Sequence, residues 1–328
     1  MSTNQELIRK ADLALSDLST AGRLNPEQTD RFIRTLIDQP TILTQCRTVA
    51  MNSYQMKINK IGFGSRILNA GASSQGVSTT NGVNGTGEGQ ALNASQRAKA
   101  DLGQIQLNTS EVIAQINIPY DVLEDNVEGG NVNTPLQTGA GGMHQTIVDL
   151  IAERAALDLE ELALRGDTSS LDTYLALCNG YLKLAQANVV NVNGAFDKNA
   201  CKAALKTMPT RYLRNRSALQ HFVSVDNETE IRDQYGSRQT ALGDQQIQGL
   251  LPVYAYGSKV TPVALMNGDQ GLYTDPMNFV FGIQRNIQIE YTKDITARVF
   301  IIVLTARVAF ALEEPNAIVK YTGLQGSR

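Results

Sequence analysis

A long polar segment lies between two stretches that have the pattern of β-strands. Residues 62–89 read GFGSRILNAGASSQGVSTTNGVNGTGEG and are rich in Gly, Asn, Ser and Thr. A compact domain rarely keeps so long a segment without secondary structure unless the segment is a lid, a binding loop or an arm. The sequences on either side distinguish between these uses.

The flanking sequences favour an arm. Before the segment, residues 49–61 place Met56 and Ile58 on one face and polar residues on the other. After it, residues 104–118 alternate apolar and polar side chains, which is the period of a half-buried strand. Two strands of about 15 residues would form a hairpin roughly 50 Å long. Because such a ribbon is marginal alone in water, we expect it to become ordered by lying on another molecule.

The composition is that of an ordinary globular protein with room for about two domains. Of the 328 residues, 42% are hydrophobic and 19% are charged, and the net charge is −3. This charge argues against a protein whose whole surface binds nucleic acid, although it leaves room for a local basic patch.

The cysteines and the termini indicate a reducing compartment and no membrane. Cys46, Cys178 and Cys201 are odd in number, widely spaced and without a CxxC motif, so neither a disulfide framework nor a zinc site is expected. The amphipathic N-terminus carries both charge signs and does not resemble a signal peptide. The most apolar run, residues 299–304, is far too short to span a bilayer.

The strongest helical pattern covers residues 144–165. Apolar residues recur there at steps of three and four, and two pairs of opposite charges stand four residues apart. Gly166 supplies the stop. At about 1.5 Å per residue the helix spans roughly 33 Å, enough to form the spine of a domain. The charge pairs are Arg154 with Asp158 and Glu161 with Arg165.

The remaining pattern mixes helices and strands without regular βαβ alternation, which predicts an α+β fold. Short helices are expected over residues 6–18 and 27–37, the second ended by Pro40. A basic helical stretch over residues 197–215 is expected to break at Pro209. The other expected elements are strands at 221–225, 252–266, 279–285, 287–291, 298–312 and 315–320, a helix at 228–235 and a flexible loop at 239–249.

No motif in the chain predicts catalysis. Residues 85–89 contain three glycines but lack the GxGxxG pattern and a surrounding βαβ unit. His144 and His221 have no carboxylate or cysteine cluster near them in the sequence, so we expect structural roles for both. We predict no catalytic, cofactor-binding or metal-binding residues, and a protein that is not an enzyme.

Three segments resemble one known family. Residues 296–323, TARVFIIVLTARVAFALEEPNAIVKYTG, are similar to its closing strand, proline and Ala-Ile-Val pattern. Residues 22–26 with Phe32 and Ile33, and residues 118–125 ahead of the long helix, match further loose motifs in the same order. The chain as a whole resembles the major capsid protein of a tailed phage, the fold named for phage HK97.

The resemblance implies a division of the chain into four parts. Residues 1–45 would be the N-terminal arm and residues 46–118 the extended loop, a long β-hairpin. Residues 119–192 and 277–328 would form the peripheral domain, with the spine helix at 144–165. Residues 193–276 would be the inserted axial domain, which lines the centre of each ring of subunits.

The function implied by the resemblance is structural. The chain would assemble into hexamers and pentamers of an icosahedral-type shell around double-stranded DNA, in the bacterial host cytoplasm, and remain in the virion. A separate scaffolding protein, a portal and a decoration protein would be partners. Lys99 would be the candidate lysine for an isopeptide crosslink, with no asparagine partner singled out. The alternative is an encapsulin-like nanocompartment holding an enzyme cargo.

Two sets of charged residues, one acidic and one basic, can each be interpreted in more than one way. For the acidic groups at element ends, we expect solvated charges or contacts between subunits. The basic side chains of residues 197–215 form a solvated face, or contact an acidic neighbour or packaged DNA without sequence specificity. The acidic groups are Asp121, Glu124 and Asp125, and Glu313 with Glu314; the basic residues are Lys198, Lys202, Lys206, Arg211 and Arg214.

Overall fold

A computed structural model describes residues 40–63, 67–68, 100–119, 143–237 and 252–325. The chain forms two compact units. Met56–Leu107 is one unit, and Met1–Gln55 with Asn108–Arg328 is the other.

The smaller unit is a two-stranded ribbon. It pairs β2 (Gln55–Gly62) with β3 (Asp101–Asn108). The predicted pairing of residues 49–61 with 104–118 is therefore wrong at its base. There, Thr109 donates its backbone N–H to the carbonyl of Tyr54 and the chain continues into a different sheet, because a much longer partner strand is available to it.

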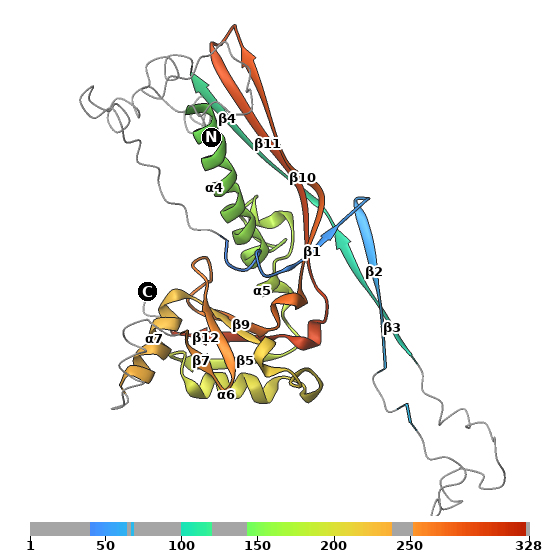
Figure 1. Ribbon diagram of the computed structural model, residues 1–328, viewed down its shortest axis with the longest axis vertical. Coiled ribbons are helices and arrows are strands. Elements are labelled where there is room, and N and C mark those ends of the chain that lie inside the picture. The colour runs from blue at the N-terminus through green and yellow to red at the C-terminus, as the bar shows by residue number, and fades with distance from the viewer. Residues whose placement is uncertain (1–39, 64–66, 69–99, 120–142, 238–251, 326–328) are drawn as a thin grey trace, which may run out of the picture. The chain divides into compact units, whose positions relative to one another are not determined.

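The larger unit contains a four-stranded sheet in the order β1-β10-β11-β4. It is built around an antiparallel pair, β10 (Phe279–Asp294) and β11 (Val299–Leu312), with β4 (Ser110–Pro119) and β1 (Arg47–Ala50) on the two edges. Residues 279–285 and 287–291, predicted as two strands, belong to one strand whose register shifts between Ile283 and Gln288. Figure 1 shows these long strands beside the helix that covers them.

That helix, α4 (Met143–Arg165), confirms the strongest helical prediction. Leu159 and Leu162 are buried in the same core as Val308 and Leu312 of β11. Both predicted ion pairs form, with Arg154 to Asp158 at 2.9 Å and Arg165 to Glu161 at 3.0 Å. Gly166 ends the helix, its N–H bonding the carbonyl of Leu162. A side chain here would clash with the carbonyl of Cys178, 2.5 Å from the Cβ position.

The second sheet has six strands in the order β5-β12-β9-β6-β8-β7. Two helices share one buried core with it, α6 (Lys198–Thr207) contacting β5 and β12 and α7 (Val225–Gly236) contacting β8. The strands are β5 (Val189–Gly194), β6 (Gln220–Val223), β7 (Tyr254–Ala255), β8 (Ser258–Pro262), β9 (Gln270–Thr274) and β12 (Val319–Leu324).

This sheet extends beyond the segment predicted as the axial domain, residues 193–276. Most of β5 precedes that segment, and β12, which follows it, lies between β5 and β9. Strand β9 was not predicted. The helical stretch at 197–215 ends before Pro209 as predicted, since α6 stops at Thr207. Short turns complete the described part: α5 (Tyr181–Leu184) and the 3₁₀ helices Leu175–Leu177, Thr210–Tyr212, Arg216–Ala218, Pro276–Asn278 and Pro315–Ala317.

The two sheets meet at a corner held by Asn278. This buried side chain accepts a hydrogen bond from the N–H of Glu314 at 2.7 Å and donates to the carbonyl of Glu314 at 3.1 Å and to the hydroxyl of Thr274 at 3.2 Å. Thr274 in turn donates to the carbonyl of Ala317 at 2.8 Å. Both strands that leave one sheet for the other are therefore fixed at the same point.

His221 is buried, and its ring contacts two tyrosines of the six-stranded sheet. The imidazole stacks on Tyr273 with ring centroids 4.2 Å apart, and its Nδ1 lies 2.8 Å from the hydroxyl of Tyr321. Burial lowers the pKa of His221 to about 3, so the ring is neutral in the fold at physiological pH.

Replacing Asn278 should destabilise the corner without unfolding the separate sheets. Asn278→Ala leaves the backbone N–H of Glu314 without its side-chain partner, and an unsatisfied buried polar group costs about 1–3 kcal/mol. We expect a fall of that size in the free energy of unfolding, measured by urea denaturation. Thr44→Ala, which removes an exposed local hydrogen bond, is the control and should change little. An unchanged midpoint for Asn278→Ala would contradict the structural role.

His221 should make the protein less stable in acid. Its folded pKa, about 3, lies below its ordinary value of 6.5, so between these values the unfolded chain binds a proton that the folded chain does not. The free energy of unfolding should therefore fall as the pH drops below 6.5, by up to about 1.4 kcal/mol per pH unit from this group. In His221→Gln, the slope of stability against pH between 6.5 and 4.5 should be shallower by that amount. Equal slopes in the two proteins would refute the assignment.

Candidate assembly surfaces

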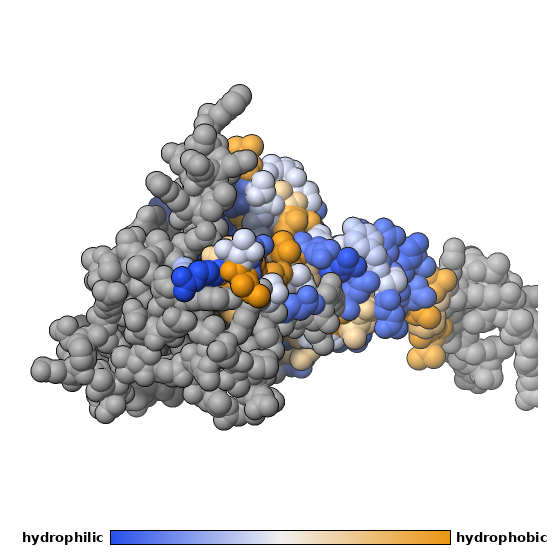
Figure 2. Space-filling view, turned by 90° about the horizontal axis from the view of Figure 1, so that it is seen from above, coloured by the Kyte–Doolittle hydropathy of each residue, from blue (hydrophilic) through white to orange (hydrophobic). Residues whose placement is uncertain are grey.

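The β2–β3 hairpin exposes apolar side chains that its own unit does not cover. Ile61 is 70% exposed, Phe63 55% and Leu102 78%. In the described part of this unit only Leu107 is buried. Figure 2 shows apolar residues gathered at one end of a mostly hydrophilic ribbon. Exposed apolar clusters of this kind are typical of surfaces at which proteins bind one another, so this end of the ribbon is a candidate assembly surface.

Glu160 attaches the segment before β1 to the spine helix. This glutamate is 2% exposed, and one carboxylate oxygen accepts hydrogen bonds from the backbone N–H groups of Thr41 and Ile42. Thr41 also donates its hydroxyl to the same oxygen at 3.1 Å. The carboxylate thus caps the turn at Thr41–Gln45, as an acidic cap satisfies the first N–H groups of a helix. Thr41 and Ile42 are therefore held against the spine helix.

The acid pair at the end of β11 is matched by arginines of the same chain. Arg47 lies 2.8 Å from Glu313, and Arg211 lies 3.8 Å from Glu314. Intrachain ion pairs were not among the expectations for this pair, which were solvated charges or contacts between subunits. The ion pairs are largely exposed and add little stability, but they tie β1 and the chain after α6 to the same corner.

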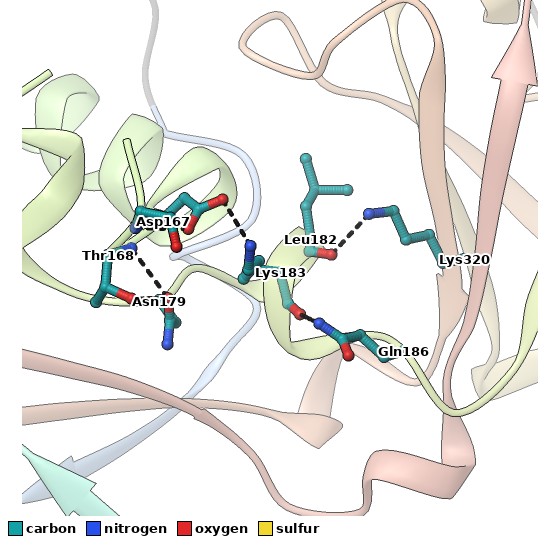
Figure 3. A network of polar contacts seen from close by, with 8 residues as sticks. Asp167, Thr168, Asn179, Leu182, Lys183, Gln186 and Lys320 are labelled. Atoms are coloured by element: carbon teal, nitrogen blue, oxygen red, sulfur yellow. Dashed lines mark hydrogen bonds and ion pairs between the residues drawn. The ribbon is translucent and has the colours of Figure 1, made fainter. Parts of the chain in front are cut away.

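A polar network fastens the chain that leaves α4 to the six-stranded sheet (Figure 3). Lys183 lies 2.8 Å from Asp167, and its hydrogen bond lowers the pKa of that carboxyl group. Lys320 of β12 donates to the carbonyl of Leu182 at 2.9 Å. On the other side of the network, Thr168 donates its N–H and hydroxyl to the side-chain carbonyl of Asn179, both at 3.1 Å.

The basic side chains of α6 are exposed. Lys198, Lys202 and Lys206 repeat every four residues along the helix, and none of them forms an ion pair within the described residues. Arg211 differs, since its guanidinium also lies over the ring of Tyr212, 4.4 Å from the centroid. The lysine row is thus available to a partner.

The three cysteines lie among the described residues as free thiols. Burial raises the pKa of the thiols of Cys46, Cys178 and Cys201 to about 12, so they are poor nucleophiles. Among these residues there is no group of three or more His, Cys, Asp or Glu placed to hold a metal. Over the same ranges, no helix has the length and apolar character needed to cross a membrane.

Several predicted features lie outside the described residues. They are the helices at 6–18 and 27–37, residues 85–89, Lys99, the acidic group at Asp121, Glu124 and Asp125, the side chain of His144 and the loop at 239–249.

Sequence reasoning missed Glu160 and Asn278. Glu160 precedes Glu161 on the helix, where two acids in a row suggest exposed charges, although Glu160 falls next to the apolar positions Leu159 and Leu162. Asn278 gives no local signal, because its main partners lie 36 residues away.

One curated protein is similar along its whole length. The chain is 39% identical over 330 residues to "Putative prophage capsid protein YqbE" of Bacillus subtilis (strain 168), and the match covers 97% of each protein. No protein-family model matches the chain.

Solved capsid structures share the fold. A chain of the satellite phage P4 procapsid, which includes the size determination (Sid) protein, aligns with a TM-score of 0.57 at 13% identity and covers 99% of this chain and 98% of its own. The capsid of a native GTA particle aligns with a TM-score of 0.61 at 13% identity, covering 95% and 100%. Microbacterium phage Oxtober96 gives 0.58 at 12% identity, covering 95% and 99%. The full-length relative and the shared architecture establish that this chain belongs to the phage major capsid proteins of the HK97 fold.

Proposed function

We propose that this chain forms hexamers and pentamers that close into an icosahedral-type shell around double-stranded DNA. Its membership of the capsid family supports a shell role. The observation that carries the proposal is the β2–β3 hairpin, whose apolar end has no cover within its own unit. A neighbouring subunit supplies that cover in a shell.

The mechanism of this function is geometric. Each subunit offers the hairpin as an extension that reaches a neighbour, together with other edges of its sheets, and each contact is modest by itself. Closed symmetry repeats every contact around the ring, and several contacts per subunit act together, so the assembly becomes much more stable than any one interface. The free edge of β4 is a further place where an extended segment can pair.

Partners follow from the same proposal. A scaffolding protein, a portal and a decoration protein act during or after assembly in the bacterial cytoplasm, and the finished chain resides in the virion. Packaged DNA contacts the inner surface through phosphates, without sequence specificity. The nanocompartment alternative is not favoured, since the relatives reported above are phage, prophage and GTA capsid proteins.

The hairpin can be tested without disturbing the fold. The triple variant Ile61→Ser, Phe63→Ser and Leu102→Ser removes side chains that are at least half exposed, so circular dichroism and the thermal midpoint of the isolated subunit should stay close to the parent. Closed particles counted by negative-stain microscopy should fall at least about tenfold, because burying this apolar surface stabilises the contact between subunits.

The matched control changes polar residues of the same hairpin. Lys57→Ser with Gln104→Ser also shortens exposed side chains, and should leave the particle yield near that of the parent. Normal particles from the apolar triple variant would remove the main support for the proposal. Particles whose absorbance at 260 and 280 nm shows protein cargo and no nucleic acid, in material from infected or induced cells, would favour the nanocompartment.

A further inference from the structure

Among the described residues, the six-stranded sheet has two edge strands of different character. Strand β5 ends the sheet on one side and β7 on the other. Helix α6 contacts β5, and helix α7 contacts β8, the neighbour of β7. Each edge therefore consists of a strand with its own helix, and the two edges can be compared as surfaces.

The β7 edge carries two exposed aromatic side chains, one on the strand and one in the tight turn that follows it. Tyr254 is 55% exposed and Tyr256 48%. Ala255 pairs with Ser258, so Tyr256 and Gly257 form a two-residue hairpin turn with φ of 51° and 90°. Asn-Gly is the favoured pair in such a turn, and a bulky side chain at positive φ is unfavourable. A tyrosine at this position costs the subunit backbone strain, which indicates that its side chain serves another purpose, such as contact with a partner.

The β5 edge carries a groove. It has a volume of about 400 Å³, enough for aromatic side chains, and lies between the strand and the start of α6. Its walls combine small apolar side chains with amides and one carboxylate, which suit an aromatic ring that ends in a hydroxyl. The lining residues include Asn191, Val192, Asp197, Asn199 and Ala203.

The two edges also carry opposite charges. On α6, Lys198, Lys202 and Lys206 are exposed; on α7, Asp233 is exposed and Asp226 and Glu230 are partly exposed. No ion pair joins these six residues to one another within the described part of the chain. Each row is therefore free to face the opposite row on another copy.

We propose that, in the ring, the β7 edge of one subunit docks on the β5 edge of the next, with Tyr254 and Tyr256 entering the groove and the acidic row of α7 facing the lysines of α6. This inference rests on the proposed shell function and names one interface within it. A ring closed head to tail requires two different, complementary patches on each subunit. Tyrosines that fill a pocket are the side chains that most often dominate such contacts.

A second copy of the chain fits these observations better than DNA or a scaffolding protein. The chain supplies both halves of the contact, in shape and in charge, on opposite edges of one sheet. DNA would explain the lysine row alone, and would leave the tyrosines, the groove and the acidic row without a role.

Two variants each remove one half of the contact. Tyr256→Asn with Tyr254→Ser restores the favoured turn sequence, so the isolated subunit should be at least as stable as the parent in thermal unfolding. Asn199→Trp fills the groove from an exposed helix position. We expect each variant alone to form rings and shells at least about tenfold less well than the parent.

Mixing the two variants tests the direction of docking. The filled-groove variant still has its tyrosines, and the tyrosine variant still has its groove, so one sound contact can form between them. Analytical ultracentrifugation of the mixture should show mixed dimers that neither variant gives alone. Parental rings from either variant, or no mixed species from the pair, would overturn the proposal.

A charge exchange separates a neighbouring subunit from DNA as the partner of α6. Lys202→Glu with Lys206→Glu should reduce ring formation, and adding Glu230→Lys with Asp233→Lys in the same chain should restore it. Normal ring formation with reduced nucleic acid content would instead assign the lysines to DNA and overturn the proposed pairing. If the parent protein itself forms no shells, the proposed function fails; if the parent forms them and these variants do too, only this interface is wrong.

Discussion

The architecture depends on one continuous antiparallel ribbon that passes through both sheets. Strand β9 pairs with β12 in the six-stranded sheet, and β10 pairs with β11 in the four-stranded sheet. Strand β9 continues into β10, and β11 continues into β12. These two segments are therefore paired with each other on both sides of the corner. Asn278 holds that corner through bonds to both lengths. Helix α4 packs against one part of the ribbon, and α6 packs against the other.

The sequence pattern predicted those elements that are determined by residues close together in the chain. The apolar stripe and Gly166 predicted α4 and its end. Pro209 predicted the end of the basic helix α6. The pairing partners of the strands were harder to predict, because pairing depends on residues far apart in the sequence. Residues 110–119 alternate as a half-buried strand should, yet the alternation does not say whether β2 or β11 lies beside them. For the same reason the C-terminal strand was assigned to the peripheral domain, although it pairs with β5 and β9.

Buried polar residues were the least predictable part of the chain. Glu160 and Asn278 are of types that usually lie at the surface, and only the folded chain brings the N–H groups of Thr41, Ile42 and Glu314 to them. Their hydrogen bonds are directional, so they select one arrangement of the connected segments as well as stabilising it. They occur where the N-terminal segment meets α4 and where the two sheets meet. At both places apolar packing is not directional, so by itself it would allow the connected segments to shift relative to one another.

Assembly surfaces follow a different physical rule from the core. The hairpin exposes Ile61 and Leu102, and the β7–β8 turn keeps Tyr256 where Asn would be less strained. The packing of the isolated subunit explains neither feature, and under the proposed assembly both would become favourable once another subunit covers them. In such a subunit the core is packed by the chain itself, whereas some apolar surface would be covered only by neighbouring subunits. In the proposed ring, Tyr254 and Tyr256 belong to the paired edge of the six-stranded sheet, so backbone pairing sets their position before subunits meet, which lowers the entropy lost on association.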